Sequence, residues 1–439
     1  MIRLIDLRGS NWDASHVIPR AGQTPDDVFD QVVPIVHDVA QRGADAVQEW
    51  TKRLDGAVPQ SLRVPADVME SAWDELAPRV RDALETAADR VRQVHQLQRP
   101  VETAVEVVPE GVIGQRWIPV RRVGLYVPGG RAVYPSSVIM NVIPAQVAGV
   151  QSLAVVSPPQ ADHDGWPHPV ILAACRMLGV SEVYAVGGAQ AVALLAYGAS
   201  LPSQSCKPVD LITGPGNVWV TAAKRAVMGQ VGIDSEAGPT EVMVVADDSA
   251  DANVVAADLV SQAEHDPLAA AVLVTDSQRL ARAVGEVLAA QVAATKHTER
   301  IAAALTGEQS AVVLVEDMDA AVAVANSYGA EHLEIQTIAA EEVAARITNA
   351  GAIFIGADSP VSLGDYAAGS NHVLPTSGMS AHSSGLGVHT FLRSVQTIKY
   401  SRQALAGIAD AVQILADAED LPAHGAAIAA RFNPADGDN

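Results

Sequence analysis

The sequence is short of cysteines and of basic residues, and each shortage excludes a class of protein. Its 439 residues include two cysteines, Cys175 and Cys206, which are too few for a disulfide framework or a cysteine-rich zinc site. We expect both to be unpaired thiols in a reducing cytosol. The formal net charge of −22 argues against nucleic acid or an anionic membrane as the main partner, because both bind to basic surfaces.

Long apolar runs and targeting signals are also missing. No run of about 18 apolar residues is free of charges, so we expect no membrane span. The first residues, Met1–Asp6, are too few and too charged to form a signal peptide, and we expect a cytoplasmic location. With 49% apolar, 18% charged and 4% aromatic residues, the composition is typical of a globular protein. A chain of this length predicts two or more domains.

The two common nucleotide-binding fingerprints are absent, but Gly-rich loops are present. No Gly-x-Gly-x-x-Gly opens a helix, and there is no Gly-x-x-x-x-Gly-Lys-[Ser/Thr]. Strand-like and helical segments nevertheless alternate from 120 to 228, which predicts a parallel sheet with helices on both faces. Ligands bind at the carboxyl ends of the strands in such sheets. Three Gly-rich loops are expected there and favour a phosphate-bearing or nucleotide ligand: Tyr126–Gly130, Gly187–Gln190 and Gly214–Asn217.

The chain before this region is predicted to be helical. One helical run begins at Thr24, is expected to kink at Pro34 and extends to about Leu54; a second extends from Pro65 to about Gln98. Beyond 237, strands and helices alternate again, which predicts a second α/β unit. A helix is expected at 402–418, and 433–439 is expected to be a disordered tail. Strands are predicted at 105–108, 115–118, 120–127, 153–156, 183–186, 209–213, 242–246, 271–275, 311–315 and 352–355.

The segment Ser261–Pro267 joins a predicted helix to a set of polar residues. The helix opens at Ser249 or Asp251, and Pro267 limits how far it can extend. Gln262 and His265 are three residues apart and therefore project from one face of the last turn. A polar helix end in water explains such a pair equally well, so its significance depends on the segments that follow.

Four further polar segments accompany this pair. Two imidazoles with a carboxylate and an open position fit a catalytic zinc site, and sulfur ligands are absent. Adjacent Glu331 and His332 offer a base beside a carboxylate, although both reach one site only if the backbone turns there. Structural histidines and solvated acids remain the competing interpretation. The four segments are Glu331/His332, Asp365, His372 and Glu419/His424.

The stretch Asp162–His168 also contains acids and imidazoles. It lies between a predicted strand and a predicted helix and is rich in turn residues, so we assign it to a surface loop.

Taken together, these motifs resemble the histidinol dehydrogenase family in their order and spacing. The resemblance extends from about Arg20 to His424, and Thr240 departs from the family pattern, in which Ser is more usual. The hydroxyl is kept, so we expect at most a small effect. The motifs are Tyr126–Gly130, Gly187–Ala191, Gly214–Asn217, Ala237–Glu241, Gln262–Asp266, Ala330–Glu334, Gly364–His372, and Glu419 with His424.

The resemblance implies a role for each matching residue. Glu331 and His332 match the catalytic pair. The positions that match the zinc ligands are Gln262, His265, Asp365 and His424. Those that match NAD contacts are Tyr126, Gln190 and Asn217. Those that match substrate contacts are Thr240, Gln262, His265, His332, Asp365, His372, Glu419 and His424.

The resemblance also implies the fold. It is an α/β fold of two incomplete Rossmann-like, doubly wound domains with helical N-terminal and extended C-terminal segments. We expect residues 1–104 to pack on a first domain, 105–132 with 237–380, that carries the zinc and catalytic residues. Residues 133–236 are expected to form the second, NAD-binding domain. Residues 381–439 are expected to form a tail that contacts a second subunit in a homodimer, where Glu419 and His424 reach the partner's site.

The implied reaction is a four-electron oxidation of L-histidinol to L-histidine, the last step of histidine biosynthesis. It passes two hydrides to two NAD molecules in turn, through bound L-histidinaldehyde. One zinc ion per subunit is implied as a template for the substrate's nitrogens. His332 takes the alcohol proton, and Glu331 activates water for the second oxidation.

Three other functions are compatible with parts of this pattern. A family relative could oxidise another small alcohol, although the presence of His372 and Glu419 argues against it. A zinc hydrolase would use Glu331 to activate water and would turn over without NAD. A non-catalytic dimer would use zinc only for stability.

Overall fold

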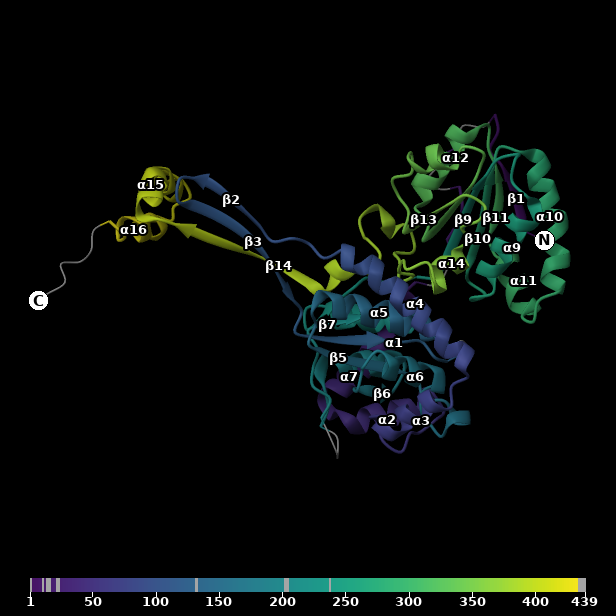
Figure 1. Ribbon diagram of the computed structural model, residues 1–439, viewed down its shortest axis with the longest axis horizontal. Coiled ribbons are helices and arrows are strands. Elements are labelled where there is room, and N and C mark those ends of the chain that lie inside the picture. The colour runs from purple at the N-terminus through teal and green to yellow at the C-terminus, as the bar shows by residue number, and fades with distance from the viewer. Residues whose placement is uncertain are drawn as a thin grey trace, which may run out of the picture. The chain divides into compact units, whose positions relative to one another are not determined.

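The computed structural model describes residues 2–9, 12, 17–20, 24–130, 133–200, 205–236 and 238–432 (Figure 1). Ala237 and the predicted disordered tail, Asn433–Asn439, lie outside the described residues. The chain forms two units. Unit 1 comprises Met1–Arg99 and Val120–Phe391, and unit 2 comprises Pro100–Pro119 and Leu392–Asn439. Unit 1 is an α/β structure with two parallel sheets, as predicted.

The first parallel sheet has five strands in the order β6-β5-β4-β7-β8. The chain starts in the middle at β4, adds β5 and β6 on one side, and then crosses to the other side for β7 and β8. The strands are β4 (Arg122–Tyr126), β5 (Ser152–Ser157), β6 (Val183–Ala185), β7 (Leu211–Thr213) and β8 (Gly232–Ile233). Its helices are α5 (Pro135–Ala148), α6 (Pro169–Met177), α7 (Gly188–Tyr197) and α8 (Val218–Ala226).

The second parallel sheet has six strands in the order β1-β11-β10-β9-β12-β13. Here β9 lies beside β10 on one side and β12 on the other, so the winding direction again reverses next to the first long strand. The strands are β1 (Arg3–Asp6), β9 (Glu241–Ala246), β10 (Ala270–Thr275), β11 (Ala311–Leu314), β12 (His332–Gln336) and β13 (Ala352–Ile355). Its helices are α9 (Ala252–Ala263), α10 (Gln278–Ala293), α11 (Thr298–Thr306), α12 (Met318–Tyr328), α13 (Ala340–Ala344) and α14 (Val361–Tyr366).

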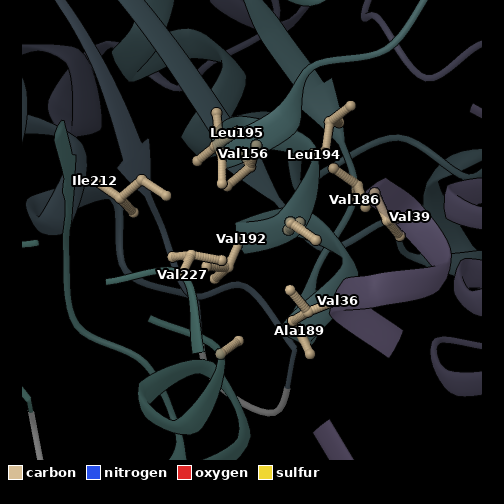
Figure 2. Close-up of a cluster of buried hydrophobic side chains, with 14 of the residues drawn as sticks. Val36, Val39, Val156, Val186, Ala189, Val192, Leu194, Leu195, Ile212 and Val227 are labelled. Carbon is tan, nitrogen blue, oxygen red and sulfur yellow. The ribbon is translucent and has the colours of Figure 1, made fainter. Parts of the chain in front are cut away.

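The N-terminal helices pack on the five-stranded sheet, not on the domain with the predicted catalytic residues. Helices α1 (Asp26–Arg42) and α2 (Ala44–Leu54) contact α7, α3 (Ala66–Asp74) contacts α6, and α4 (Pro78–Leu97) contacts α5. Figure 2 shows Val36 and Val39 of α1 directed toward apolar side chains of this sheet and its helices. The predicted placement of these helices is therefore wrong, because the apolar face of α1 packs on α7 and α8. The segment before them does lie on the predicted domain, since β1 pairs with β11 and Ile18 joins the core of that sheet.

Two predicted helical runs are each divided in the structure. Helix α1 continues through Pro34 and ends at Gly43, whose φ of 60° ends one helix and begins the next. The run from 65 to 98 is divided before Pro78, which occupies the first turn of α4. None of the helices in the described ranges is both long enough and apolar enough to cross a bilayer.

The predicted boundary at 105–132 is also wrong. Strand β4 pairs with β5 and β7, so it is the central strand of the five-stranded sheet. The residues before it belong to unit 2, where β2 (Thr103–Val108) and β3 (Gly111–Pro119) pair antiparallel. The sequence pattern identified these strands but not their partners, because pairing depends on contacts between distant residues.

Unit 2 contains a strand that was not predicted. The strand β14 (Leu392–Tyr400) pairs antiparallel with β3 along its whole length. Two helices follow, α15 (Arg402–Ala418), which was predicted with these bounds, and α16 (Pro422–Ala429). Residues 381–391 belong to unit 1, so the expected tail begins later than predicted.

Gly214 lies where a side chain has no room. Its φ is +115°, and a Cβ there would lie 2.1 Å from the Tyr126 carbonyl oxygen. We expect Gly214→Ala to lower the free energy of unfolding by about 2–4 kcal/mol through strain and overpacking. The matched control is Gly285→Ala in α10, where a Cβ would meet open space. This change should raise the free energy of unfolding by about 0.5–1 kcal/mol. Urea unfolding measures both, and changes of the same sign would contradict this account.

Candidate active site

The predicted catalytic and metal-holding residues of unit 1 lie at the amino edge of the six-stranded sheet. Strand β9 begins at Glu241 and β12 at His332, and these ends are neighbours, since His332 pairs in register with Val242. Helices that connect parallel strands run back antiparallel to them. The carboxyl end of α9 therefore brings Gln262 to the same edge. Asp365, near the end of α14, lies there too, since its Oδ1 is 3.8 Å from His332 Nε2.

A chain of hydrogen bonds connects α9 to Glu331. Gln262 Nε2 donates to Thr240 Oγ1 over 2.9 Å, and Thr240 Oγ1 donates to Glu331 Oε2 over 2.6 Å. The backbone N–H of Glu241 donates to the same carboxylate oxygen over 2.9 Å. The Glu331 carboxylate is therefore fixed by two donors.

His332 is oriented as a base. Its Nδ1 lies 3.1 Å from the Glu241 carbonyl oxygen. A carbonyl accepts only, so Nδ1 carries the proton and Nε2 has the free lone pair. Nε2 is buried without a hydrogen-bond partner and lies 3.8 Å from Asp365 Oδ1. Glu331 Oε2 lies 3.5 Å from His332 Nδ1, so the two adjacent side chains reach one site.

Burial sets the proton affinities of the pair. It raises the pKa of Glu331 well above its usual range, against the opposing effect of the hydrogen bonds from Thr240 and Glu241. Burial lowers the pKa of His332, and the Asp365 charge opposes this shift. His332 therefore stays neutral to a lower pH than a solvated histidine, and Glu331 binds a proton more tightly than a solvated carboxylate.

Glu241 contacts both predicted catalytic residues. Its backbone contacts each of them, and its buried carboxylate is paired with Arg20, whose guanidinium also donates to the Tyr328 carbonyl. Burial raises the pKa of the Glu241 carboxyl group, while Arg20 lowers it. Arg20 thus neutralises the buried carboxylate of the residue whose backbone holds both side chains.

The donor set around Asp365 fits a metal ion in its chemistry. Asp365 Oδ2 lies 3.9 Å from His265 Nε2. Gln262 Oε1 is a buried acceptor without a hydrogen-bond partner, as expected for an atom that awaits a cation. Burial lowers the pKa of His265, which favours the neutral imidazole that metals bind. Across the described ranges, no three His, Cys, Asp or Glu side chains form a metal-sized cluster, so these residues alone do not complete a site.

His372 connects the two sheets of unit 1. Its Nδ1 donates to the Asp365 carbonyl over 2.9 Å, and its Nε2 accepts from Ser137 Oγ of α5 at 3.2 Å. Asn371 donates to the Met140 carbonyl of α5 over 2.7 Å. Burial lowers the pKa of His372. The helix that follows β4 therefore meets the segment that carries Asp365.

The three predicted NAD-contacting residues lie after strands of the five-stranded sheet. The Tyr126 hydroxyl accepts from the Gly188 N–H at 3.1 Å, which joins two of the Gly-rich loops. Gln190 is buried, and its Oε1 has no hydrogen-bond partner. Asn217 is exposed and caps α8 by accepting from two backbone N–H groups. The loops after β4 and β7 flank the position where the winding direction changes, the usual ligand crevice of such a sheet. The loop after the edge strand β6 is tied to them through the Tyr126 hydroxyl.

The last two predicted site residues, Glu419 and His424, belong to unit 2. Both are exposed, at the end of α15 and in α16.

Comparison with known proteins assigns the chain to a family. The family model described as histidinol dehydrogenase matches residues 18–432. Histidinol dehydrogenase of Thermobifida fusca is 59% identical over 98% of both chains. That of Mycolicibacterium smegmatis is 57% identical over 98% of this chain and 97% of the relative. A crystal structure of histidinol dehydrogenase from Elizabethkingia anophelis is 30% identical, with a TM-score of 0.92 over 98% of both chains.

The chain belongs to the histidinol dehydrogenase family. It is therefore an NAD-dependent oxidoreductase of histidine biosynthesis, as the sequence predicted.

Several residues that shape this histidinol dehydrogenase site were not predicted. Asp55, after α2, accepts from Gln190 Nε2 at 3.0 Å, and burial raises the pKa of Asp55 to about 6. Lys224 donates to the Gly214 carbonyl over 3.0 Å and pairs with Asp234, which accepts the Gly214 N–H. Lys224 lies next to Arg225 in a mostly apolar stretch, and this basic pair was the one available signal. Asp55 carried none.

Two other sequence predictions are confirmed. In Asp162–His168, His168 caps α6 by accepting the Val170 N–H, which is a structural role. Both cysteines are buried and form no disulfide.

The Thr240 hydroxyl is predicted to be essential, whereas its methyl group is not. In Thr240→Val, Glu331 loses one donor and Gln262 loses its acceptor, so the rate of NADH formation should fall about 10–100-fold. Loss of a donor also raises the Glu331 pKa further, so the pH profile should move to higher pH. Thr240→Ser should stay within about threefold of the original enzyme. Steady-state kinetics measured against pH tests both variants. A fully active Thr240→Val would show that the hydrogen bonds from Gln262 through Thr240 to Glu331 do not matter for the reaction.

Proposed function

We propose that this enzyme oxidises L-histidinol to L-histidine through bound L-histidinaldehyde, in two steps at one site. The observation that carries this proposal is the orientation of His332. Its Nδ1–H donates to the Glu241 carbonyl and its Nε2 has no partner, and the hydrogen-bonded carboxylate of Glu331 lies beside it. A neutral imidazole and a carboxylate of raised pKa supply the two bases that an alcohol and an aldehyde hydrate require.

In the first step, His332 Nε2 takes the proton of the substrate hydroxyl as the carbon passes a hydride to NAD. The products are the aldehyde, NADH and a proton on the imidazole. In the second step, ionised Glu331 takes a proton from water as it adds to the aldehyde. As the water adds, His332 returns its proton to the aldehyde oxygen, which gives the neutral hydrate and restores the neutral imidazole. The hydrate then passes a hydride to a second NAD while His332 accepts one hydroxyl proton, and the resulting acid releases its remaining proton to solvent to give the carboxylate.

Zinc fits the residues at the amino edge of the six-stranded sheet. Gln262, His265 and Asp365 would hold it, and His424 would supply the fourth ligand. A bound ion would fix the substrate's imidazole and amino nitrogens as a template. The unpartnered Gln262 Oε1 supports this role. Thr240, His372 and Glu419 would complete the substrate contacts.

Tyr126, Gln190 and Asn217 would bind NAD at the crevice of the five-stranded sheet. Each sheet would then be an incomplete Rossmann-like, doubly wound unit, one for the cofactor and one for the substrate. The orientation of Gln190 supports this assignment. Its amide nitrogen is held by Asp55, so its oxygen is left to accept a hydrogen bond from a donor such as a hydroxyl or a carboxamide.

Unit 2 supports a homodimer. Among its described residues, Ala404 and Ala416 are the only buried apolar side chains. In contrast, Val105, Ile398 and Leu415 are 60–73% exposed. A unit of this size without a core needs another surface to cover its apolar side chains. A second copy of the chain would do so and would bring Glu419 and His424 to its partner's site. The free buried cysteines support a cytoplasmic location.

The central test is the yield of NADH from L-histidinol. The zinc-loaded enzyme should form two NADH per L-histidine, and EDTA should abolish the reaction until zinc is restored. His332→Asn should lose both oxidations. Glu331→Gln should form one NADH and stop at the aldehyde. A full second NADH with Glu331→Gln in stopped-flow would overturn its role. Zinc-dependent turnover without NADH would indicate a hydrolase, and turnover of other alcohols alone would indicate a different substrate.

The shared site is tested by mixing two inactive variants. His332→Asn and His424→Ala subunits should each be inactive alone. After joint refolding in equal amounts, half of the dimers should be mixed and one site of each should be intact, so about a quarter of the original activity should return. If each site were built from one chain, no activity would return. Glu342→Gln, an exposed acid on α13, serves as the mixing control and should leave activity unchanged.

A further inference from the structure

Strand β12 carries an unusual set of buried side chains. A central strand of a parallel sheet is covered on both faces and normally consists of apolar residues. Leu333 and Ile335 follow this rule and face the apolar cluster beside α12 and α13. His332, Glu334 and Gln336 alternate with them and therefore share the opposite face, and all three are at most 4% exposed. Two polar residues lie beyond the catalytic one and have no role in the proposed reaction.

These two polar residues bond to the helices on either side of the site. Gln336 Nε2 donates to Asp258 Oδ2 of α9 over 2.7 Å and to Glu334 Oε2 over 2.9 Å. Glu334 Oε1 accepts the backbone N–H of Val361, the first residue of α14, at 2.9 Å. Glu334 thus contacts α14 directly and α9 through the shared amide.

The two helix positions in this network have a common relation to the metal-holding residues. Asp258 lies four residues before Gln262, and Val361 lies four residues before Asp365. Residues four apart lie above one another on a helix. Glu334 likewise lies two residues from His332 on the same face of β12. Asp258, Val361 and Glu334 are therefore each the next residue on the same helix or strand face as a residue of the predicted active site.

The network contains two carboxyl groups and no cation. Within the described ranges, neither Glu334 nor Asp258 forms an ion pair with a basic side chain. The neighbours of Glu334 in the sheet are Val244 of β9 and Phe354 of β13, which are both apolar. Glu334 is buried and Asp258 is half-buried, and two adjacent carboxyl groups removed from water in this way cannot both be ionised without a cost. One proton held between them removes that cost.

We propose that Asp258, Glu334 and Gln336 form a proton-sharing positioning network that holds α9 and α14 so that Gln262 and Asp365 are placed for the metal. The inference rests on the proposed zinc site. Glu334 is a positioning residue here, because it touches neither substrate nor metal.

The proton affinity of Glu334 agrees with this geometry. Burial, followed by the Asp258 charge and the hydrogen bond with Asp258, raises the pKa of Glu334 from 4.5 to about 8. The hydrogen bonds from Val361 and Gln336 act in the opposite direction. Burial also raises the pKa of Asp258. The folded state therefore keeps a proton that the unfolded state releases. The free energy of unfolding should fall as the pH rises from about 4.5 to about 8, and this contribution should be constant above pH 8.

The first experiment measures zinc retention in the full-length, zinc-loaded enzyme, as release to a colorimetric chelator at neutral pH. Glu334→Leu removes the contacts with both helices, and zinc release should be roughly tenfold faster. Glu334→Gln keeps an acceptor for Val361 and a neutral group beside Asp258, so its release should stay within about twofold of the original rate. The exposed control Glu342→Gln should not differ. Equal release from Glu334→Leu and the original enzyme, or equal acceleration by both Glu334 variants, would overturn the positioning role.

The second experiment tests the shared proton and needs no zinc. The melting temperature of Glu334→Gln minus that of the original protein should increase from about pH 5 to about pH 8 and then level off. Asp258→Asn removes the neighbouring charge and should reduce the pH dependence of the melting temperature. If Glu334→Leu does not fold, Asp258→Asn takes its place in the zinc-release experiment. A difference independent of pH would overturn proton sharing. If the original protein binds no zinc, the proposed metal site fails, and the melting curves still decide whether the proton is shared.

Discussion

The site depends on the backbone of one residue, Glu241. It is the first residue of β9, and its N–H and C=O groups are hydrogen-bonded to the side chains of Glu331 and His332, the proposed catalytic pair. The parallel pairing of β9 with β12 sets this arrangement, since it fixes where His332 lies along its neighbour. The carbonyl selects the His332 tautomer, and the N–H helps to hold the Glu331 carboxylate. Any change that shifts β9 along β12 would therefore alter the base and the carboxylate together.

In unit 1, the predicted cofactor and substrate residues lie at opposite strand ends of the two sheets. The predicted NAD loops follow the carboxyl ends of strands in the five-stranded sheet, whereas Glu331 and His332 lie at the amino ends of strands in the six-stranded sheet. The Ser137–His372 and Asn371–Met140 hydrogen bonds join these edges through α5. A cofactor bound at the carboxyl ends of the five-stranded sheet would thus lie next to a substrate bound at the amino ends of the six-stranded sheet. In the six-stranded sheet, polar residues also continue beneath the site as far as Gln336.

Local sequence patterns predicted most of the secondary structure and the residues that gather in unit 1. Glycine and proline marked the loops, and apolar periodicity marked β13 and α15 with the bounds that the structure has. Gln262, His265, Glu331, His332, Asp365 and His372 do lie in one region. The sequence did not reveal that β4 joins the sheet of β5 and β7, that β14 pairs with β3, or that Asp55 holds Gln190. These features depend on contacts across long stretches of chain, for which a local pattern has no signal.

The pairing of β3 with β14 has a consequence for how the protein is made. Pro119 pairs with Leu392 and Gly111 with Tyr400, so the third strand of this sheet leaves the ribosome long after the first two. At about 5–20 residues per second, roughly 15–55 s separate the synthesis of the two partners. During that interval the β2–β3 hairpin has an unpaired edge, which is the kind of surface that associates with other chains. Unit 2 can therefore be completed only after the whole of unit 1 has been synthesised.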